Sequence, residues 1–278
     1  KNLFEGDIAP DSTAGSFMAG VLAHSRELTV FTNPLPNSYQ RFGCDEAPRY
    51  VSWSRQNRSQ LVRIPQVKGD NCRMELRSPD PACNPYLAIG LVLAAGLDGI
   101  EHRMVLPPPV NKNLFRPGEA EGLGLEMLPA TLEEAVAIAE ESDFLHKVLP
   151  EELSRRYFAE ERARCEALRA AADDIAGKLE GLVLPIVMRV GDNDKLYGSV
   201  TTAIIGDALT AQGIEVDRRR ILLDHPIRTL GDHPVRVRLH ADVVASLTVK
   251  VVSEDKAHLV EEEAAEAPAE APTEEAAE

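Results

Sequence analysis

Apolar residues recur along the chain at two spacings, and each spacing predicts a different kind of element. Helical spacing marks residues 12–29 and returns throughout residues 150–179. Strict alternation of apolar and polar residues marks RYVSWS, QLVRIP and RMELR, all between residues 49 and 77. These alternating runs predict short strands, each with one buried face. The Pro- and Asn-rich stretch NPLPNSYQRF, which follows the first helix, is predicted to be loop.

Two further helices are indicated by their start signals. Asn84 precedes Pro85, and this pair predicts a helix that is capped by the Asn84 side chain and ends near Gly99. Thr131 and Glu134 form a capping box ahead of the run TLEEAVAIAEE. The apolar run PYLAIGLVLAAGLDGI is too short to span a bilayer, so we expect a buried helix and no membrane partner.

Beyond Gly181 the pattern changes to short strands around one helix. Strands are predicted at LVLPIVMRV, DRRRILLD, HPVRVRLH and ASLTVKVV, and a helix at SVTTAIIGDALTAQG. After Ser253 the sequence is acidic and of low complexity, which cannot bury a core. We therefore predict an α+β chain. The family resemblances given below imply its division into a first domain (1–165), a connecting helix (166–180), a small α+β domain (181–253) and a disordered acidic tail (254–278).

A short heptad pattern lies where the first two parts join. Its apolar residues follow one another at spacings of three and four, which places them on one side of a helix. The pattern is too short for a coiled coil, so we expect this helix to dock on a core. The residues are Cys165, Leu168, Ala172, Ile175 and Leu179.

Charge and cysteine content exclude several classes of protein. The net charge is −15 over 278 residues, and residues 254–278 hold ten acidic residues against one lysine. No region is a basic tail, so we expect weak non-specific affinity for nucleic acid. The four cysteines form no CxxC pair and no zinc-type spacing, which favours reduced thiols and a cytoplasmic protein. Because the chain begins at Lys1, we expect a truncated or processed amino terminus.

The alternating stretch CRMELRSPDP carries the most chemistry. In an extended strand, Arg73, Glu75 and Arg77 share one face, and Met74 and Leu76 the other. Arginines bind carboxylates and phosphates through two parallel hydrogen bonds, and a carboxylate between them can hold a divalent cation. The face therefore suits one wall of a phosphate and metal site. A solvated face of an antiparallel sheet is the alternative.

Four motifs extend this observation. TNPLPNSYQRF, EAPRYVSWSRQNRSQLVRIP, RMELRSPDPACNPYLA and LAAGLDGI follow one another in order. Together they closely resemble the carboxyl-terminal half of the glutamine synthetase catalytic domain, over residues 1–165. The resemblance implies part of an antiparallel sheet covered by helices. It also implies ligation of ammonia to glutamate through γ-glutamyl phosphate, with ATP and Mg²⁺ or Mn²⁺ as cofactors.

The resemblance assigns roles to seven charged residues. Of these, Glu46 and Arg63 are implied to be catalytic, because Glu46 accepts a proton from ammonium and Arg63 stabilises the transferring phosphoryl group. Glu46 as a turn cap and Arg58 as a surface residue are the alternatives. Trp53 and Tyr86 are expected in the core. The roles are glutamate binding for Arg41 and Arg77, ammonium binding for Glu46, nucleotide binding for Arg58, Arg63 and Arg73, and metal binding for Glu75.

Three departures from the family pattern affect the expected activity. The stretch RFGCDE is one residue shorter than the common form, and Phe115 stands where many bacterial members have a modified tyrosine. The amino-terminal part of the domain, which supplies the family's other metal ligands, has no counterpart here. One carboxylate cannot fix two Mg²⁺ ions, so we expect an inactive chain by itself, and ring-shaped homo-oligomers only with the front half present.

A second resemblance covers residues 175–253. KLYGSVT, ALTAQGIEVDRRRILL and PIRTLG resemble the carboxyl-terminal domain of bacterial ribosomal large-subunit protein nine. That family implies a ribosomal RNA partner, although the domain that provides its main RNA anchor has no counterpart here. Arg218–Arg220 as a solvated turn is the alternative. The candidate phosphate contacts are Lys195, Arg218, Arg219, Arg220 and Arg228.

Three hypotheses for function follow from these patterns. The first is a glutamine synthetase-type ligase, and the second is an RNA-binding component of the ribosome. The third is a stable carboxyl-terminal domain that carries a partly folded passenger. A natural fusion, an engineered chimera and an assembly artefact all fit the junction of two family halves.

Overall fold

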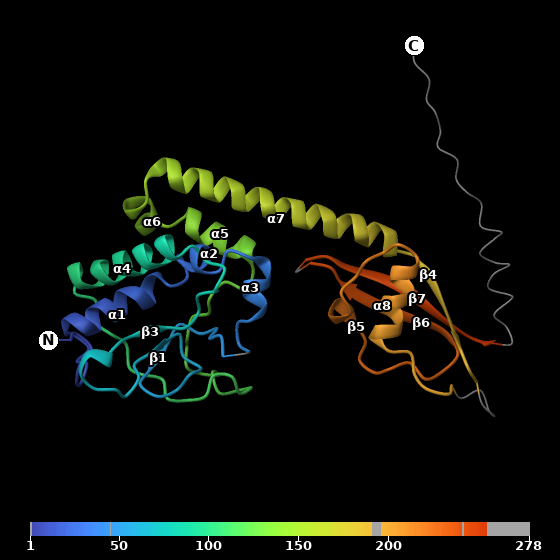
Figure 1. Ribbon diagram of the computed structural model, residues 1–278, viewed down its shortest axis with the longest axis horizontal. Helices are drawn as coiled ribbons and strands as arrows, with labels where there is room; N and C mark the ends of the chain where they lie inside the picture. The colour runs from blue at the N-terminus through green and yellow to red at the C-terminus, as the bar shows by residue number, and fades with distance from the viewer. Residues whose placement is uncertain (1, 45, 191–195, 241, 255–278) are drawn as a thin grey trace, which may run out of the picture. The chain divides into compact units, whose positions relative to one another are not determined.

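The computed structural model describes residues 2–44, 46–190, 196–240 and 242–254. The chain divides into two compact units between Cys165 and Glu166 (Figure 1). Each unit has its own core of buried hydrophobic residues. The α+β class predicted from the sequence is confirmed in both units.

Two helices that lie side by side organise the first unit (Figure 1). Helix α1 (Thr13–His24) starts at Ser12, whose hydroxyl accepts a hydrogen bond from the Gly15 amide. Helix α4 (Pro85–Glu101) starts at Asn84, whose side chain accepts from the amides of Tyr86 and Leu87, as predicted. The other helices of this unit are α2 (Thr29–Thr32), α3 (Pro36–Gln40), α5 (Leu132–Glu140), α6 (Asp143–Val148) and the first part of α7 (Glu151–Leu179).

The sheet of the first unit has the order β1-β2-β3. Its strands are β1 (Trp53–Ser54), β2 (Val62–Arg63) and β3 (Glu75–Leu76), and a short 3-10 turn, η1 (Gly69–Asn71), lies between β2 and β3. Strands β2 and β3 are antiparallel, whereas β1 and β2 are parallel. The sheet is therefore mixed, not purely antiparallel as expected.

The strands are shorter than the alternating runs that predicted them. Pro65 closes the run after β2 and Pro79 closes the run after β3, and proline has no amide hydrogen for a ladder. The predicted alternation itself is confirmed, because Val62 and Ile64 are buried while Arg63 lies on the other face.

Two expectations about loops and aromatics were wrong. The stretch NPLPNSYQRF contains helix α3, because Pro36 occupies its first turn, where a proline ring suits helical geometry, and Tyr39 is buried in the core. Tyr86 is 88% exposed on α4 and so lies outside the core. Trp53 is buried as expected, and its indole nitrogen donates to the carbonyl of Pro107 at 2.7 Å.

A partly buried ionic network connects three helices of this unit. The His24 ring lies 2.9 Å from Asp98 of α4 and 3.3 Å from Glu27, and it stacks on Phe144 of α6. The hydroxyl of Ser142 donates to Glu27. Burial alone would lower the pKa of His24, but the hydrogen bonds and charges of Glu27 and Asp98 raise it. The network connects α1, α4 and α6, and the two carboxylates favour the charged form of the imidazole.

This network predicts a pH window for stability. Because the pKa of His24 is raised in the folded state, His24 adds to the free energy of unfolding below about pH 6.5. This stabilisation is lost as the pH rises further. Burial opposes ionisation of Glu27, but His24 and Ser142 lower its pKa, so its contribution is lost as the pH falls below about 4.5. The first unit should therefore gain most from this network between these values.

Urea denaturation followed through Trp53 tests the window, because this single tryptophan lies in the first unit. Between pH 6 and 8, the free energy of unfolding should fall more steeply in the parent chain than in His24→Asn. His102→Asn, at an exposed imidazole near Asp98, is the control and should keep the parent slope. Equal slopes in all three proteins would contradict the assignment to His24.

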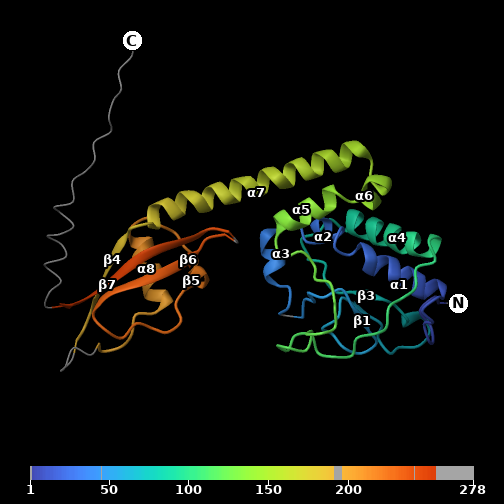
Figure 2. The same ribbon diagram turned by 180° about the vertical axis from the view of Figure 1, so that it is seen from behind.

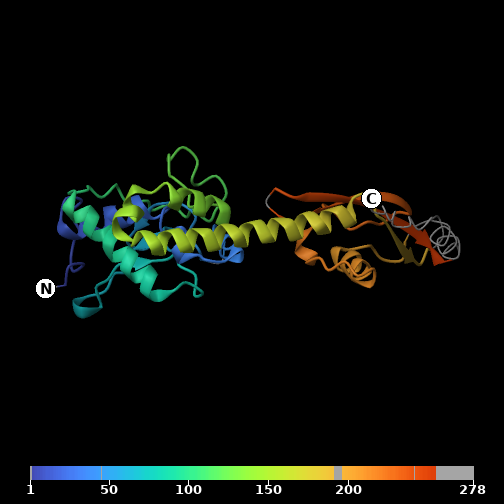
Figure 3. The ribbon, with the colours of Figure 1, turned by 90° about the horizontal axis from the view of Figure 1, so that it is seen from above.

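The heptad residues of α7 divide between the two cores. Cys165 is buried in the first core, Ala172 and Leu179 are buried in the second, and Leu168 is 40% exposed. The predicted helix over 150–179 is confirmed as one continuous element (Figure 3). The pattern thus reflects docking on cores, as expected, and no coiled-coil seam runs through the described residues.

Glu161 of α7 is the most buried carboxylate in the first unit among the described residues, at 4% exposure. Burial raises the pKa of Glu161, and Arg164 at 3.4 Å only partly opposes this. Glu161→Gln removes the charge and keeps the shape, so it should stabilise the unit at pH 7 by about 1 kcal/mol. Glu160→Gln, on the exposed side of α7, is the control.

Trp53 fluorescence in urea measures both glutamate variants. The gain from Glu161→Gln should shrink at low pH, because a raised folded-state pKa means that the protonated carboxyl is the stabilised form. A destabilised Glu161→Gln variant would instead show that the carboxylate supports the fold in its charged form.

The second unit is a four-stranded sheet with one face covered by a helix (Figure 2). The strand order is β4-β7-β6-β5; β4 and β7 are parallel and the other pairs antiparallel. The predicted strand DRRRILLD begins instead as a 3-10 turn, because Asp217 caps it by accepting from the Arg219 amide. The elements are β4 (Val183–Met188), α8 (Thr202–Ala211), η2 (Arg218–Arg220), β5 (Ile221–Leu222), β6 (Gly231–Arg238) and β7 (Val244–Ser253).

Candidate functional site

A cluster of charged side chains lies on the sheet of the first unit. The register of β2 and β3 places Arg63 directly opposite Glu75. One Glu75 oxygen accepts from Arg63 at 3.0 Å, and the other accepts from Arg73 at 2.6 Å. The carboxylate of Glu75 therefore bridges two guanidinium groups on the face predicted from the alternation.

Glu46 forms a second bridge in the same cluster. Its two carboxylate oxygens lie 3.2 Å from Arg58 and 3.3 Å from Arg77. The backbone of Glu46 is in the left-handed region, with φ of 63°. This conformation costs about 1–2 kcal/mol for a residue other than glycine, and such strain is concentrated at functional sites. Glu46 therefore joins Arg58 and Arg77 through its carboxylate.

The cluster contains spare hydrogen-bond donors. Nε of Arg63 and Nη1 of Arg77 are buried and have no hydrogen-bond partner in the part of the chain that the structure describes. Burial lowers the pKa of Arg77; Glu46 opposes this, whereas Arg63 and Arg58 add to it. Four guanidinium groups face two carboxylates, so the cluster carries excess positive charge and suits an anion such as phosphate or carboxylate.

Arg41 is not brought into direct contact with this cluster. Its guanidinium donates to the Asn33 side chain and to the Ser78 carbonyl, both at 3.0 Å, and pairs with Asp80 at 3.2 Å. Ser78 directly follows Arg77, so Arg41 adjoins the cluster through the main chain. The sequence reasoning missed Asn33 and Asp80 as partners that orient Arg41.

The described residues do not form a metal site by themselves. Burial would raise the pKa of Glu75, but hydrogen bonds from Arg73 and Arg63 lower it, so the carboxylate is ionised. Both its oxygens are already bonded to arginines, and no three His, Cys, Asp or Glu side chains of the described ranges come together as ligands. A divalent cation needs more oxygen ligands than Glu75 supplies.

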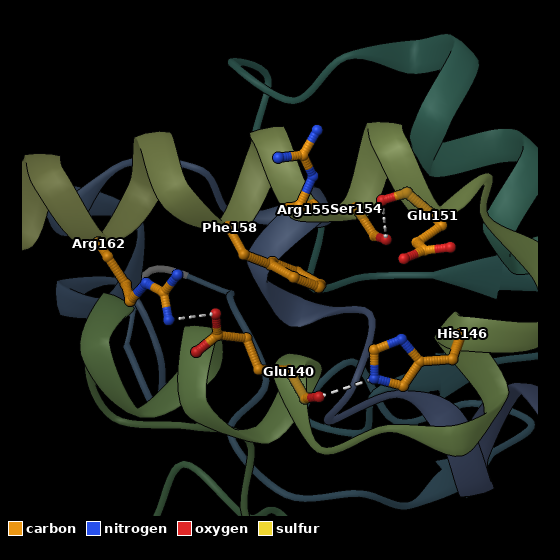
Figure 4. Close-up of a pocket in the computed structure, with 7 residues that line it drawn as sticks. All are labelled: Glu140, His146, Glu151, Ser154, Arg155, Phe158 and Arg162. Carbon is orange, nitrogen blue, oxygen red and sulfur yellow. Dashed lines mark hydrogen bonds and ion pairs between the residues drawn. The ribbon is translucent and has the colours of Figure 1, made fainter.

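The larger of two described cavities lies away from this cluster. It has a volume of about 490 Å³ and lies where α5, α6 and α7 meet within the first unit (Figure 4). Arg162 pairs with Glu140 at 2.9 Å across it, and the His146 ring contacts the Glu140 carbonyl. A second cavity, of about 380 Å³, is lined by residues that include Phe115. Neither cavity contains any of the seven predicted site residues.

The candidate RNA contacts of the second unit are largely bonded to its own groups. Arg218 pairs with Asp207 at 2.6 Å, and Arg219 pairs with Asp217 at 2.8 Å, which holds the pKa of Asp217 at about 2. Arg220 donates to a backbone carbonyl.

The side chains of three other arginines of the second unit, Arg228, Arg236 and Arg238, are exposed and make no hydrogen bond or ion pair within the described residues. Arg228 is one of the predicted contacts. The reasoning missed Arg236 and Arg238, which share the outer face of β6; the strict alternation of HPVRVRLH could have revealed them. Lys195 lies outside the described residues.

No helix within the described ranges combines the length and the apolar character needed to cross a bilayer. This statement includes α4, the helix formed by the most apolar run.

Comparison with known proteins follows the division into two units. The family model "Glutamine synthetase, catalytic domain" matches residues 1–178, and "Ribosomal protein L9, C-terminal domain" matches residues 170–253. The glutamine synthetase of Methanocaldococcus jannaschii is 42% identical over 165 residues, which are 58% of this chain and 36% of that protein. That of Methanosarcina mazei is 42% identical over 61% of this chain and 39% of that protein.

Solved structures give the same result. The GmaS/ADP complex is 34% identical, with a TM-score of 0.54, and the match covers 61% of this chain and 40% of that chain. GmaS without ligand matches with a TM-score of 0.53. This chain therefore spans a little over a third of the length of these relatives. The chain belongs to the glutamine synthetase catalytic-domain family, and it also carries the C-terminal domain of ribosomal protein L9.

Proposed function

We propose that the first unit is the phosphate- and glutamate-binding part of a glutamine synthetase site. The reaction is ATP-dependent ligation of ammonia to glutamate through γ-glutamyl phosphate. The observation that carries this proposal is the convergence of Arg58, Arg63, Arg73 and Arg77 on Glu46 and Glu75. Two buried donors of this cluster find no partner among the described residues. Excess positive charge with spare donors is what a transferring phosphoryl group requires.

The roles follow from burial and bonding. Arg63 and Arg77 are the two most buried arginines of the cluster, so they are best placed to bind the transferring group and the glutamate carboxylate. Arg58 and Arg73 are more exposed and suit the outer phosphates of a nucleotide. Glu46, whose backbone is strained, would bind ammonium and take its proton. Arg41 would orient glutamate beside Arg77, and ATP supplies the phosphoryl group.

We further propose that the described residues are inactive without added polypeptide. Glu75 is the only predicted metal ligand, and both its oxygens are bonded to arginines. The relatives are nearly three times as long as the matched segment, so the other ligands would come from the remainder of the domain.

Reconstitution tests the proposal. The 278-residue chain is mixed with the part of the M. jannaschii glutamine synthetase that lies outside the match, and γ-glutamyl transfer to ammonia, with release of phosphate, is measured in the presence of glutamate, ammonia, ATP and Mg²⁺. Transfer is expected from the mixture and from neither protein alone. Absence of transfer from a mixture that forms a stable complex would contradict the proposal.

A second candidate function, binding of ribosomal RNA, concerns the second unit. Three exposed arginines that form no ion pair with the part of the chain that the structure describes favour it: Arg228, Arg236 and Arg238. On the outer face of the sheet, Arg236 lies opposite Ser246 and Arg238 opposite Val244, so no carboxylate of β7 neutralises them.

Substitution of the β6 arginines tests the RNA proposal. The double variant Arg236→Ala and Arg238→Ala should weaken binding to large-subunit RNA and lower the slope of log affinity against log salt by about 2. Arg219→Ala, whose charge is already paired with Asp217, is the control and should change the slope little. An unchanged slope in the double variant would exclude the sheet face.

A further inference from the structure

The outer face of β6 carries two guanidinium groups that lack a counter-ion among the described residues. Arg236 and Arg238 are both exposed, and the side chains of β7 that lie opposite them carry no charge. The one acidic residue of β6, Asp232, lies near the other end of the strand, opposite Lys250. Residues two apart on a strand are about 7 Å apart, so the two positive charges act together on an anion. We call Arg236 and Arg238 the β6 arginine pair.

A strongly acidic segment begins directly after β7. Residues 254–278, which we call the acidic tail, hold ten acidic residues against Lys256. Of these residues only Glu254 lies within the described ranges. The Glu254 carboxylate accepts a hydrogen bond from Nε of Arg189 at 3.1 Å. The first acidic side chain of the tail is therefore already bonded to an arginine of the second unit.

The acidic tail is long enough to reach the β6 arginine pair. Strand β7 runs antiparallel to β6, and the arginines lie opposite Ser246 and Val244, which precede the end of β7 at Ser253. The separation along the strand is about 24–31 Å. A dozen residues of extended chain span about 40 Å, so Glu266 and the four acidic residues after it can reach both arginines. Tethering at this length keeps the acidic side chains at an effective concentration in the millimolar range.

We infer that the acidic tail binds the β6 arginine pair of its own molecule and competes there with RNA. The contact itself needs no RNA, whereas the competition rests on the proposed RNA-binding function of the second unit. Other arginines suit the tail less well, because Arg218 and Arg219 are already paired with carboxylates that the tail would have to displace. Exposed ion pairs are individually weak and are screened by salt, so the contact is reversible.

The resonances of arginine side chains test the contact without RNA. The full chain, with isotope-labelled arginine, is compared by NMR with a chain that ends at Glu254. At low salt the Nε resonances of Arg236 and Arg238 should differ between the two chains. The difference should vanish at about 0.5 M salt, where the Debye length falls to about 4 Å. Arg219, whose charge is paired with Asp217, is the internal control and should shift little.

A neutral tail of the same length separates charge from mere presence of the segment. This variant combines Glu266→Gln, Glu270→Gln, Glu274→Gln, Glu275→Gln and Glu278→Gln. It keeps every residue position and removes the five charges that reach the β6 arginine pair. Its Arg236 and Arg238 resonances should match those of the shortened chain.

Affinity for large-subunit RNA tests the competition. If the tail occupies the β6 arginine pair four-fifths of the time, the full chain should bind RNA about fivefold more weakly than the shortened chain. The neutral-tail variant should bind like the shortened chain. RNA that binds none of the three proteins would refute the RNA proposal alone, because the resonances test the contact independently.

Three results would overturn the inference. The first is that Arg236 and Arg238 have the same resonances in the full and shortened chains, even if the shortened chain binds RNA more tightly, because the tail would then act by repulsion at a distance. The second is a difference that grows with protein concentration, which would assign the contact to the tail of a second copy. The third is a difference confined to Arg58 and Arg73, which would assign the tail to the first unit.

Discussion

Gly99→Ala is expected to destabilise the first unit by about 3 kcal/mol, at the upper end for overpacking. A Cβ at Gly99 would overlap the carbonyl oxygen of Ser16 in α1 and lie 2.7 Å from the backbone of Gly20. These obstacles are backbone atoms, so no side chain can rotate away and the two helices must separate. Separation would also pull His24 away from Asp98. The loss should far exceed the small gain that alanine brings within a helix.

Gly90→Ala is the matched control for this prediction. Gly90 lies in the same helix, and nothing lies within 4 Å of a Cβ built there. Alanine at this position should stabilise the unit by about 0.5–1 kcal/mol, because glycine loses more backbone entropy on helix formation. Urea denaturation followed through Trp53 measures both variants. If Gly99→Ala and Gly90→Ala had similar stabilities, close contact of α1 with α4 would be contradicted.

Arg63→Ala is expected to lower γ-glutamyl transfer by the reconstituted pair about 10²–10³-fold, the usual effect of losing one charged donor to a transition state. Arg63 is largely buried, is fixed opposite Glu75 by the strand register, and keeps one nitrogen unpaired. The fold should survive, because Glu75 remains bonded to Arg73. Arg63→Lys should restore little activity, since an ammonium group cannot reproduce two parallel hydrogen bonds.

Arg162→Ala is the control for Arg63→Ala. Arg162 also pairs with a glutamate, at 2.9 Å, but it lies on α7 beside the larger cavity and away from the cluster. Its loss should change transfer less than twofold. Equal losses from both variants would show that the activity responds to general destabilisation, and full activity of Arg63→Ala would remove the cluster from the site.

Local signals were sufficient for most elements of this fold. The caps at Asn84 and Thr131 are hydrogen bonds to amides two or three residues away, so the sequence carries all the information that they need. Helix α3 and the turn at Arg218–Arg220 were mistaken for loop and strand. In the first case burial of Tyr39 outweighed the composition of the segment, and in the second Asp217 capped a turn.

The sequence predicted which site residues share a face within one strand, but not how residues from different segments pair. Alternation placed Arg73, Glu75 and Arg77 on one face, and the structure keeps their charges within one cluster. The pairing of Glu46 with both Arg58 and Arg77 had no local signal, because the partners are 12 and 31 residues away. The separate position of Arg41 was equally invisible, since it depends on Asn33, Ser78 and Asp80.

The sequence by itself determined the two family segments, the helix starts and the alternation of the strands, because each depends on neighbours within a few residues. Only the tertiary structure decided which carboxylate bridges which arginines, that both oxygens of Glu75 are bonded to arginines, and that apolar side chains on one side of α4 are exposed. Strand register and helix packing bring distant residues together, and the energy of an ion pair or an apolar contact depends on that distance and on burial.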